Sequence, residues 1–385
     1  MFQFTSLPPL ALYIHLPWCV RKCPYCDFNS HEAPTALPES EYVDALIRDL
    51  EQDLPLIWGR PIVSIFIGGG TPSLFSAEAI DRLFSGLRAR LKLLPGIEVT
   101  LEANPGAVEA GKFREFRALG INRLSIGIQS FQDAPLKALG RIHGGREAIA
   151  AAEAAHAAGF DDFNLDLMHG LPGQSVESGL ADVRQAIALS PSHVSYYQLT
   201  IEPNTLFHAR PPALPDDELL ADIEEGGQAL LAEAGYAQYE VSAYAREGQR
   251  CAHNLNYWEF GDYLGIGAGA HGKLTLPAEQ RITRRARTKN PRDYLPLAGT
   301  PSAFVEETVK PRDAAFEFML NALRLKEGFS PSLFQERTGL PLGLLRDALE
   351  RAEQAGLMTW DIQNIRPTAR GWRYLNDLMQ HFLPG

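Results

Sequence analysis

Short apolar runs alternate with longer segments of helical periodicity through the first 235 residues of the chain. Six runs rich in Val, Ile, Tyr and Phe, bounded by Gly, Pro or Asn, predict β-strands. They span residues 12–16, 63–67, 98–101, 123–128, 163–168 and 194–201. The helical patterns span residues 39–53, 77–91, 107–119, 146–158, 176–189 and 216–234. This alternation predicts a parallel sheet with right-handed crossovers, and periodicity alone does not distinguish an open doubly wound sheet from an incomplete barrel.

The remaining chain changes its pattern twice. Residues 236–311 are less regular and contain the strand-like YEVSAYA, the glycine-dense GDYLGIGAGAHGK and the basic RITRRARTKN. From residue 312 the pattern predicts helices over 314–326, 331–338 and 341–355, a strand pair over 357–367 and a helix over 369–381, which is the order of a winged-helix module. We therefore expect three regions: an α/β region over 1–235, a segment over 236–311 that completes the core, and a winged-helix-like α+β region over 312–385.

The charge of the chain narrows the choice of partner. Of its 385 residues, 36 are Lys or Arg and 47 are Asp or Glu, so the net charge of −11 opposes non-specific binding to nucleic acid or to an anionic membrane. The predicted helix over 341–355 is itself net negative, unlike a helix that enters a DNA groove. No run approaches about 18 consecutive apolar residues, and no basic segment precedes the apolar opening. We therefore expect a cytoplasmic protein that does not bind nucleic acid.

Three of the four cysteines, Cys19, Cys23 and Cys26, form a C-x3-C-x2-C group directly after the first predicted strand. An odd, tightly spaced trio is a poor disulfide framework, and clustered thiols in a reducing compartment indicate metal. Three thiolates can hold three irons of a [4Fe-4S] cluster and leave the fourth iron open to a small molecule. A zinc site completed by His15 or His31 is the alternative, but zinc ligands usually come as two separated pairs, and the sequence has no second pair.

The segment that carries this trio, LYIHLPWCVRKCPYCDF, resembles the cluster motif of the radical S-adenosylmethionine (SAM) enzymes. The resemblance extends from Tyr13 to the C-terminus and implies a partial (β/α)6 barrel with a [4Fe-4S] cluster whose open iron chelates the amino and carboxylate groups of SAM. In that family an electron from the cluster cleaves SAM to a 5′-deoxyadenosyl radical. The resemblance is strongest to the branch that contains oxygen-independent coproporphyrinogen III dehydrogenases and the related heme chaperones.

Conspicuous residues fall near the ends of the predicted strands, where a barrel places its ligand-binding groups. GGGTP follows the second strand, and Glu102, Gln129 and Asp166 fall near the ends of the next three. The resemblance implies that SAM is surrounded by Tyr13, Tyr25, Gly69, Gly70, Thr71, Glu102, Gln129, Arg141 and Asp166. It also implies that the loop GIGAGA approaches the adenosine end of SAM. This loop matches a dinucleotide fingerprint, but the strand-like KLTL rather than a helix follows it.

Two departures separate the chain from the porphyrinogen dehydrogenases of this branch. Their motif has a fourth cysteine where this chain has Phe28, and their chains extend further before the cluster strand, whereas only twelve residues precede Tyr13 here. We therefore expect dehydrogenase activity to be absent and assign no catalytic residue. In contrast, HNLNYW matches a segment associated with heme binding in the chaperone group, which implies heme contact by His253, Tyr257 and Trp258, with the axial ligand unassigned.

Two further features have an ordinary structural interpretation. The fourth cysteine, Cys251, lies far from the cluster motif and is expected to be a packed free thiol. The basic run over 281–289 is expected to be a solvated face, although it could also neutralise the propionates of a porphyrin.

These inferences lead to one expected function and two alternatives. We expect a heme chaperone that binds a [4Fe-4S] cluster, SAM and heme and passes heme to respiratory-chain hemoproteins; delivery could involve docking at the membrane through a partner protein, and a homodimer is left open. The first alternative is a coproporphyrinogen III dehydrogenase, which forms protoporphyrinogen IX by oxidative decarboxylation. The second, a tRNA-modifying radical enzyme, is disfavoured by the net charge and by the lack of a recognisable RNA-binding module.

Overall fold

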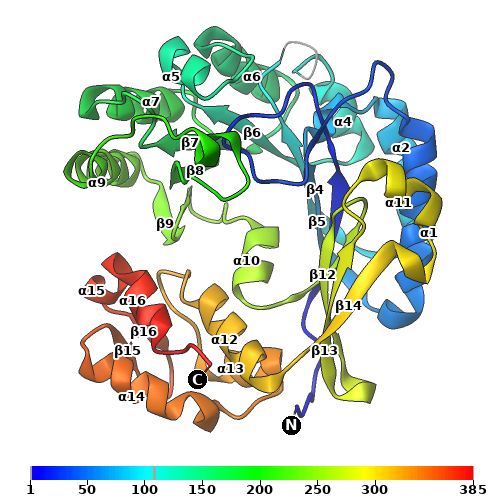
Figure 1. The fold of residues 1–385 in the computed structure, drawn as a ribbon, viewed down its shortest axis with the longest axis vertical. Helices are drawn as coiled ribbons and strands as arrows, with labels where there is room; N and C mark the ends of the chain where they lie inside the picture. Colours follow the sequence, from blue (N-terminus) through cyan, green and yellow to red (C-terminus); the bar gives the residue numbers. More distant parts are fainter. Residues whose placement is uncertain (1, 107–109, 385) are drawn as a thin grey trace.

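The computed structural model describes residues 2–106 and 110–384 and has a twelve-stranded sheet in the order β14-β13-β12-β11-β1-β4-β5-β6-β7-β8-β10-β9 (Figure 1). Six consecutive strands of this order pair in parallel. They are β1 (Leu10–Leu16), β4 (Pro61–Gly69), β5 (Lys92–Ala103), β6 (Arg123–Gln129), β7 (Asp162–His169) and β8 (His193–Gln198). Strands β1 and β8 each pair with other strands and not with one another, so the six form a partial barrel. The expected α/β fold is confirmed, and each predicted strand overlaps one of the six.

Helices cover the outer face of these strands (Figure 1). The six that correspond to predicted helices are α1 (Glu39–Ile57), α2 (Ala77–Arg88), α4 (Phe113–Leu119), α6 (Gly145–Ala157), α7 (Val176–Ala188) and α9 (Asp217–Glu233). Residues 107–109, which begin one predicted helix, lie outside the described residues. The shorter α5 (Asp133–Ala138) and α8 (Leu206–Ala209) lie in the connections after β6 and β8. A small parallel pair, β2 (Trp18–Cys19) and β3 (His31–Glu32), closes the loop after β1.

Apolar side chains pack between the sheet and its helices and form the main core. Leu12, Ile14 and Ile65 of β1 and β4 have no exposed surface, and neither do Leu83 and Leu87 of α2, which lie on one face of that helix at i and i+4. Burial on both faces is typical of parallel strands covered by helices. Because this core fixes the strands, residues at their carboxyl ends keep fixed positions relative to one another.

Shorter strands extend the sheet at both sides. On one side β11 (Asp262–Ile266) pairs with β1 in parallel, and β12 (His271–Leu276), β13 (Arg281–Arg287) and β14 (Phe304–Val309) follow in antiparallel. On the other side the strand-like YEVSAYA forms β9 (Ala237–Glu240) and β10 (Ala243–Ala245). Helix α10 (Ala252–Trp258) connects these two sides and contacts β4.

The basic run on β13 differs from the expected solvated face because carboxylates engage it. Arg285 and Arg287 both pair with Asp53 of α1, and Arg284 pairs with Glu317. Arg287 and Asp53 are 3% and 0% exposed. A buried charge is tolerated when an opposite charge satisfies it, and here the carboxylates come from segments distant in sequence, which the run itself does not reveal.

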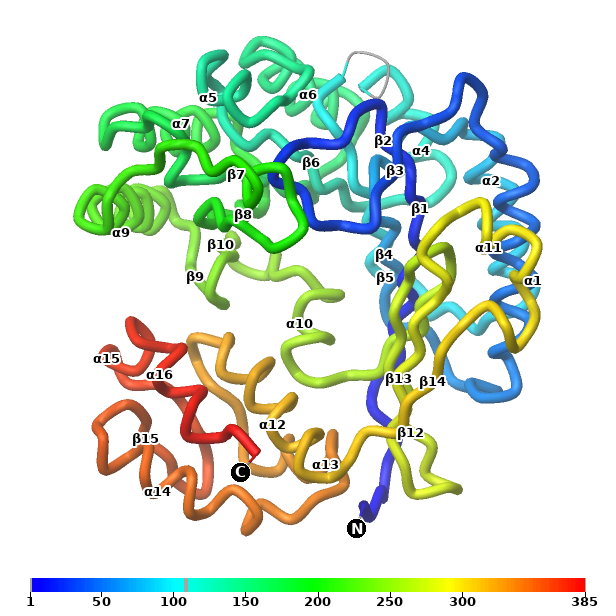
Figure 2. Tube along the Cα trace, viewed as in Figure 1, coloured from blue at the N-terminus to red at the C-terminus, as the bar shows by residue number. Residues whose placement is uncertain are grey.

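The chain from residue 311 onward forms a group of helices with its own buried apolar cluster, which includes Phe318, Phe334, Leu349 and Ile365 (Figure 2). Its elements are α12 (Pro311–Ala322), α13 (Pro331–Thr338), α14 (Arg346–Gln354), β15 (Met358–Trp360), β16 (Ile365–Pro367), α15 (Ala369–Arg373) and α16 (Leu375–Gln380). Their order agrees with the prediction, except that the helix predicted over 369–381 is divided into α15 and α16 and that the α-helix predicted from residue 341 begins at Arg346. In the part of the chain that the structure describes, no helix has the length and apolar character needed to cross a membrane.

Candidate functional site

The three clustered cysteines lie in a loop at the carboxyl ends of the barrel strands. The loop leaves β1 and turns where the Cys26 N–H donates to the Cys23 carbonyl oxygen at 3.1 Å. Figure 2 shows it extending from β1 toward β6 and β7, and the Pro24 carbonyl oxygen in this loop accepts the Phe207 N–H at 3.0 Å. Cys19, Cys23 and Cys26 all line one cavity of about 410 Å³, called the smaller cavity below.

The spacing of the thiols tests the zinc alternative. A single tetrahedral zinc with Zn–S bonds of about 2.3 Å needs sulfur ligands about 3.8 Å apart. Among the described residues, the three ligating side chains whose donor atoms lie within 4.8 Å of one another are Glu98, Cys251 and His253, and the loop cysteines do not form such a set. His15 and His31, the remaining ligands of that alternative, are hydrogen-bonded within the protein. The described part of the cysteine loop therefore holds no set of donor atoms already closed around a single zinc ion.

Two half-buried carboxyl groups, Glu102 and Asp166, line the smaller cavity from β5 and β7. Glu102 accepts the Gly69 N–H at 3.0 Å, and Asp166 accepts hydrogen bonds from Ser125 at 3.1 Å and Asn164 at 2.8 Å. Burial, and then the neighbouring Asp166, raises the pKa of Glu102 to about 8, which the Gly69 N–H partly offsets. Burial also raises the pKa of Asp166. A positively charged or hydroxyl-bearing ligand would therefore be stabilised beside this pair.

Gln129 is held at the end of β6 in an unusual backbone conformation. Its φ is +68°, in the left-handed region that residues other than glycine seldom adopt, and its side chain is almost fully buried. Its Oε1 accepts a hydrogen bond from the Tyr197 hydroxyl at 3.0 Å. Ser130 and Phe131, the next two residues, both donate to Asp182, which fixes the turn. Backbone strain kept in place by such bonds is typical of ligand-binding sites.

Arg141 brings a positive charge to the cysteine side of the smaller cavity. One terminal nitrogen donates to the Asn104 side chain at 2.6 Å and to the Gly127 carbonyl oxygen at 2.8 Å, and the other lies 3.6 Å from Cys23 Sγ. Its Nε is buried and has no hydrogen-bond partner in the described part of the chain. A buried, incompletely satisfied guanidinium favours an anionic group nearby, such as a thiolate or a ligand carboxylate.

The segment GGGTP is tightly packed against the end of β1. The N–H groups of Gly69, Gly70 and Thr71 donate to Glu102 and to backbone carbonyl oxygens of β1 and β2. A Cβ on Gly70 would lie 2.5 Å from the Trp18 carbonyl oxygen, so packing alone requires a glycine there. All three residues line the smaller cavity. Because their N–H groups are already used, they can offer a ligand carbonyl oxygens rather than backbone donors.

A second cavity of about 870 Å³, called the larger cavity below, adjoins the first. Residues that line both cavities are Cys26, Asp27, Phe28, Ser30, Gly69, Glu102 and Glu202. Tyr25 lines the smaller cavity, whereas Tyr13 lines the larger one, with its hydroxyl 2.8 Å from His15 Nδ1. From the loop GIGAGA, Gly269 lines the larger cavity. Every residue predicted around SAM therefore lines one of two contiguous cavities.

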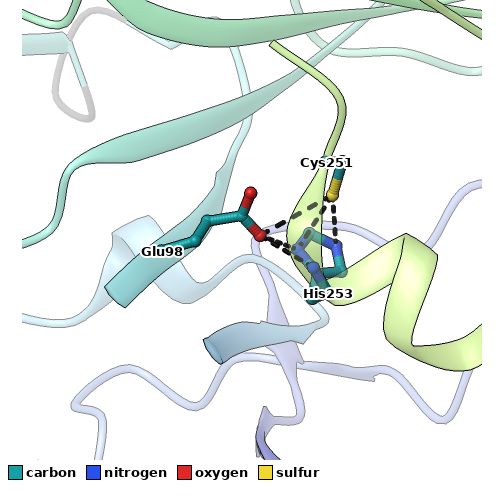
Figure 3. A group of neighbouring side chains, drawn as sticks. All are labelled: Glu98, Cys251 and His253. Atoms are coloured by element: carbon teal, nitrogen blue, oxygen red, sulfur yellow. Dashed lines mark hydrogen bonds and ion pairs between the residues drawn. The ribbon is translucent and has the colours of Figure 1, made fainter. Parts of the chain in front are cut away.

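The expected heme residue His253 lies behind the wall of the larger cavity. Its side chain is 5% exposed, with Nδ1 2.8 Å from Glu98 Oε1 and 3.1 Å from Cys251 Sγ (Figure 3). Its ring stacks on Phe66 with centroids 4.2 Å apart, and Phe66 rather than His253 lines the cavity. Cys251 is fully buried beside this histidine.

The other two heme candidates diverge along α10. Tyr257 lines the larger cavity, whereas Trp258 lines a separate pocket of about 310 Å³ between α10 and α12. The Arg324 guanidinium lies over the Trp258 ring, 4.2 Å from its centre. The structure thus brings one of the three predicted heme residues, Tyr257, to the surface of the larger cavity.

Sequence reasoning missed several residues of these cavities. Asn104 and Tyr197 contact Arg141 and Gln129 in the smaller cavity. His271 lines the larger one together with Lys289, which belongs to the basic run already considered for the propionates of a porphyrin. Asn104 could have been found, because it lies two positions after Glu102 at the same strand end. His271 and Lys289 reach the cavity only through the extra strands β11–β13, whose pairing the sequence did not reveal.

Comparison with known proteins places the chain in a family. The Radical SAM superfamily model matches residues 13–185, and the HemN C-terminal domain model matches residues 309–374. The heme chaperone HemW of Escherichia coli (strain K12) is 52% identical over 379 residues, covering 98% of this chain and 99% of the relative. The heme chaperone HemW of Haemophilus influenzae (strain ATCC 51907 / DSM 11121 / KW20 / Rd) is 51% identical over 382 residues, and that of Bacillus subtilis (strain 168) is 33% identical over 379 residues. These two cover 98% and 97% of this chain, respectively, and 99% of each relative.

A solved structure agrees with this assignment at the level of the fold. Coproporphyrinogen III oxidase HemN from Escherichia coli, described as a radical SAM enzyme, matches with a TM-score of 0.81 and 24% identity, covering 98% of this chain and 90% of that one. The fold and the cysteine loop thus define a radical SAM protein with a HemN-type C-terminal region. Within that class, the chain belongs to the HemW family. Membership of the radical SAM superfamily implies a [4Fe-4S] cluster and SAM.

Proposed function

We propose that this chain is a cytoplasmic heme chaperone that holds heme in the larger cavity, beside a [4Fe-4S] cluster and SAM in the smaller one, and delivers it to respiratory-chain hemoproteins. The observation that supports this most is the larger cavity itself. It adjoins the cysteine-lined cavity, and its volume of about 870 Å³ lies in the upper part of the range of small-molecule and cofactor sites. The names of the HemW relatives support the same proposal.

Cys19, Cys23 and Cys26 would hold the cluster. Burial raises the pKa of the Cys19 and Cys26 thiols, so metal binding must supply the free energy of their deprotonation. One terminal nitrogen of Arg141 lies 3.6 Å from Cys23 Sγ and would donate to that sulfur in the bound cluster. Cys251 lines neither cavity, so the loop supplies three thiolates and no fourth. The bound cluster would supply an open iron and a reducing electron.

The polar groups of the smaller cavity match the charges of SAM. The carbonyl oxygens of GGGTP suit the ammonium group of its methionyl end, and Arg141 suits its carboxylate. Glu102 and Asp166, whose pKa values are raised by burial, would be stabilised in the ionised form by the sulfonium charge or would accept from the ribose hydroxyls. Gln129, held by Tyr197, adds an amide N–H₂ at the same strand ends.

The larger cavity offers a porphyrin both flat apolar area and polar anchors. Phe28, Phe66, Tyr257 and Tyr263 contribute aromatic rings to its lining. Such rings pack well on a macrocycle, and the lysines and histidines of the same wall can meet its propionates and its iron. Phe28, which stands where the dehydrogenase motif has its fourth cysteine, is among the residues that line both cavities.

The proposed chaperone function is tested by transfer. Reconstituted protein loaded with one heme is mixed with an apo-cytochrome, and heme uptake is followed by its absorbance, with free heme as the reference. We expect the wild type to transfer its heme to the apo-cytochrome. We expect a cluster-free Cys23→Ser variant to transfer less heme. Absence of stoichiometric heme binding by the wild type would contradict the proposal.

A coproporphyrinogen III dehydrogenase is the second candidate, because the fold is shared with HemN. Supplying coproporphyrinogen III, SAM and a reductant under anaerobic conditions distinguishes the two. We expect no protoporphyrinogen IX above a no-enzyme control. Stoichiometric conversion would replace the chaperone proposal with an enzymatic one.

A further inference from the structure

Three histidines line the larger cavity, and they differ in how far their ring nitrogens are engaged. His15 is 4% exposed, with its two nitrogens 2.8 Å from the Tyr13 hydroxyl and 2.9 Å from the Asn29 carbonyl oxygen. His31 Nε2 lies 3.3 Å from the Asn29 side-chain oxygen. His271 is exposed in the cavity wall, and within residues 2–106 and 110–384 no hydrogen bond engages either of its ring nitrogens. His271 is therefore the histidine best able to offer a nitrogen to a ligand.

His271 is held firmly in this position by strand pairing. It is the first residue of β12 and lies opposite Ala286 of β13. On its other side, a Cβ on Gly265 of β11 would overlap the His271 carbonyl oxygen, so the two strands approach this closely only because residue 265 is glycine. The loop GIGAGA, which matches a dinucleotide fingerprint, thus leads directly into a histidine in the wall of the larger cavity.

The charges around His271 suit a ligand that carries both a metal and carboxylates. Lys289 lines the same cavity, and no described carboxylate lies within 4.0 Å of its ammonium group, whereas Arg285 and Arg287 of the same basic run pair with Asp53. The ring nitrogens of His271, which no described group engages by a hydrogen bond, remain available to a metal in the same cavity.

We propose that His271 is the axial ligand of the heme iron in the larger cavity and that Lys289 pairs with a heme propionate. This inference rests on the proposed heme chaperone function and names the groups that carry it. A neutral imidazole is a common axial ligand of heme iron, and an ammonium–carboxylate pair at the rim would orient the macrocycle. His253 is then a positioning residue: it stacks on the buried side of Phe66, whose ring lines the cavity.

The test is a titration of ferric heme into the full-length, cluster-loaded protein, followed by Soret absorbance and by EPR. His271→Ala is expected to lower heme affinity about tenfold and to change the EPR g-values, and added imidazole is expected to restore them. His208→Ala is the matched control, because His208 is an exposed histidine of α8 that lines neither cavity. Lys289→Ala is expected to lower the affinity for heme and to make that affinity less dependent on salt, while the g-values stay unchanged. Lys289→Arg is expected to restore the affinity.

The outcomes separate this inference from the proposed function. If wild-type protein binds heme but His271→Ala keeps its affinity and g-values, His271 is not the ligand and the chaperone proposal stands. Loss of the wild-type g-values in His31→Ala or His253→Ala, with His271→Ala unaffected, would reassign the ligand in the same way. If wild-type protein binds no heme, the proposed function itself fails, and this inference fails with it.

Discussion

At the scale of single residues, the smaller cavity is built from groups that folding has removed from water without fully satisfying them. Glu102 has one hydrogen bond from Gly69 and a second carboxyl group, Asp166, beside it, and Arg141 has a buried Nε without a partner. Each of these groups raises the free energy of the ligand-free protein. A ligand with complementary charges recovers that free energy on binding, which is why such groups concentrate in binding sites.

The raised pKa of Glu102 predicts a pH-dependent stability. Between its ordinary pKa of 4.5 and about 8, the folded state holds a proton that the unfolded state releases. Stability is therefore full below pH 4.5 and falls as pH rises toward 8. In cluster-free protein, the Glu102→Gln variant is expected to lack this fall and to be more stable than the wild type by about 3 kcal/mol at pH 7, but not at pH 4.5. The measurement is urea unfolding of both proteins, which gives the free energy of unfolding at each pH from 4.5 to 8.

The control for this prediction is Glu247→Gln, a substitution of an exposed glutamate in a turn. It is expected to leave the wild-type pH dependence unchanged. Parallel stability curves for the wild type and Glu102→Gln would show that the Glu102 carboxyl ionises normally in the folded protein.

The left-handed conformation of Gln129 permits a test that separates backbone from side chain. Both Gln129→Gly and Gln129→Ala remove the amide and its contact with Tyr197, so both are expected to weaken SAM binding equally in calorimetric titrations. Only glycine adopts φ of +68° without a steric cost, so Gln129→Gly is expected to be about 1 kcal/mol more stable than Gln129→Ala. Equal stabilities, or retained SAM binding in either variant, would argue against this role of Gln129.

At the scale of elements, the sheet extension β11–β14 is attached to the barrel through buried charges. Asp53 of α1 meets both Arg285 and Arg287 of β13, while β11 pairs directly with β1. The extension carries His271 and Gly269 into the wall of the larger cavity. The geometry of that cavity therefore depends on the contact between β13 and α1.

Removing Asp53 takes away a carboxylate that two arginines share and leaves each with one other partner, Arg285 with Glu306 and Arg287 with Asp49. Asp53→Ala is expected to lower the free energy of unfolding by about 2–3 kcal/mol, measured by denaturant unfolding. Glu350→Ala, which breaks the exposed Arg346–Glu350 pair of α14, is the matched control and is expected to cost less than about 1 kcal/mol. If the two variants lose similar free energy, β13 is not attached through Asp53.

At the scale of the whole molecule, two apolar clusters are joined near α10. One cluster lies between the sheet and its outer helices, and the other lies mainly within the C-terminal helices but also includes Phe2, Phe260 and Ile282. Arg324, which follows α12, lies over Trp258 of α10 and donates to Glu240 of β9 at 2.9 Å. This single side chain therefore links the C-terminal helices to both α10 and the barrel edge.

Loss of the Arg324 contacts is expected to lower the local stability of the C-terminal helices and α10 more than that of the barrel strands. Arg324→Ala leaves Glu240, which is 3% exposed, without its charge partner. We expect faster amide hydrogen exchange in residues 311–384 and in α10, with the strands β4–β7 unchanged. Arg373→Ala, which removes the exposed Arg373–Glu225 pair, is the control and should leave exchange unaltered. Uniformly faster exchange would indicate that the two clusters unfold as one unit.

The features that depend on neighbouring residues were predicted from the sequence, whereas those that depend on contacts between distant segments were not. Strands such as β1 and β7 are apolar runs with turn residues at their ends, so local pattern located them. Glu102 and Gln129 could be placed together because the carboxyl ends of parallel strands meet at one side of a barrel. In contrast, neither the φ of Gln129 nor its bond from Tyr197 leaves a signal in the local sequence.

The sequence by itself determined the class of this protein. Local patterns and motif spacing predict the barrel units, the cysteine loop and the polar strand ends. Only the tertiary structure decided which candidates reach the cavities. His253 lies in a promising motif but is covered by Phe66, whereas His271, which no motif singled out, lines the larger cavity. The physical reason is that burial and charge pairing depend on residues from distant segments, which come together only when the strands pair.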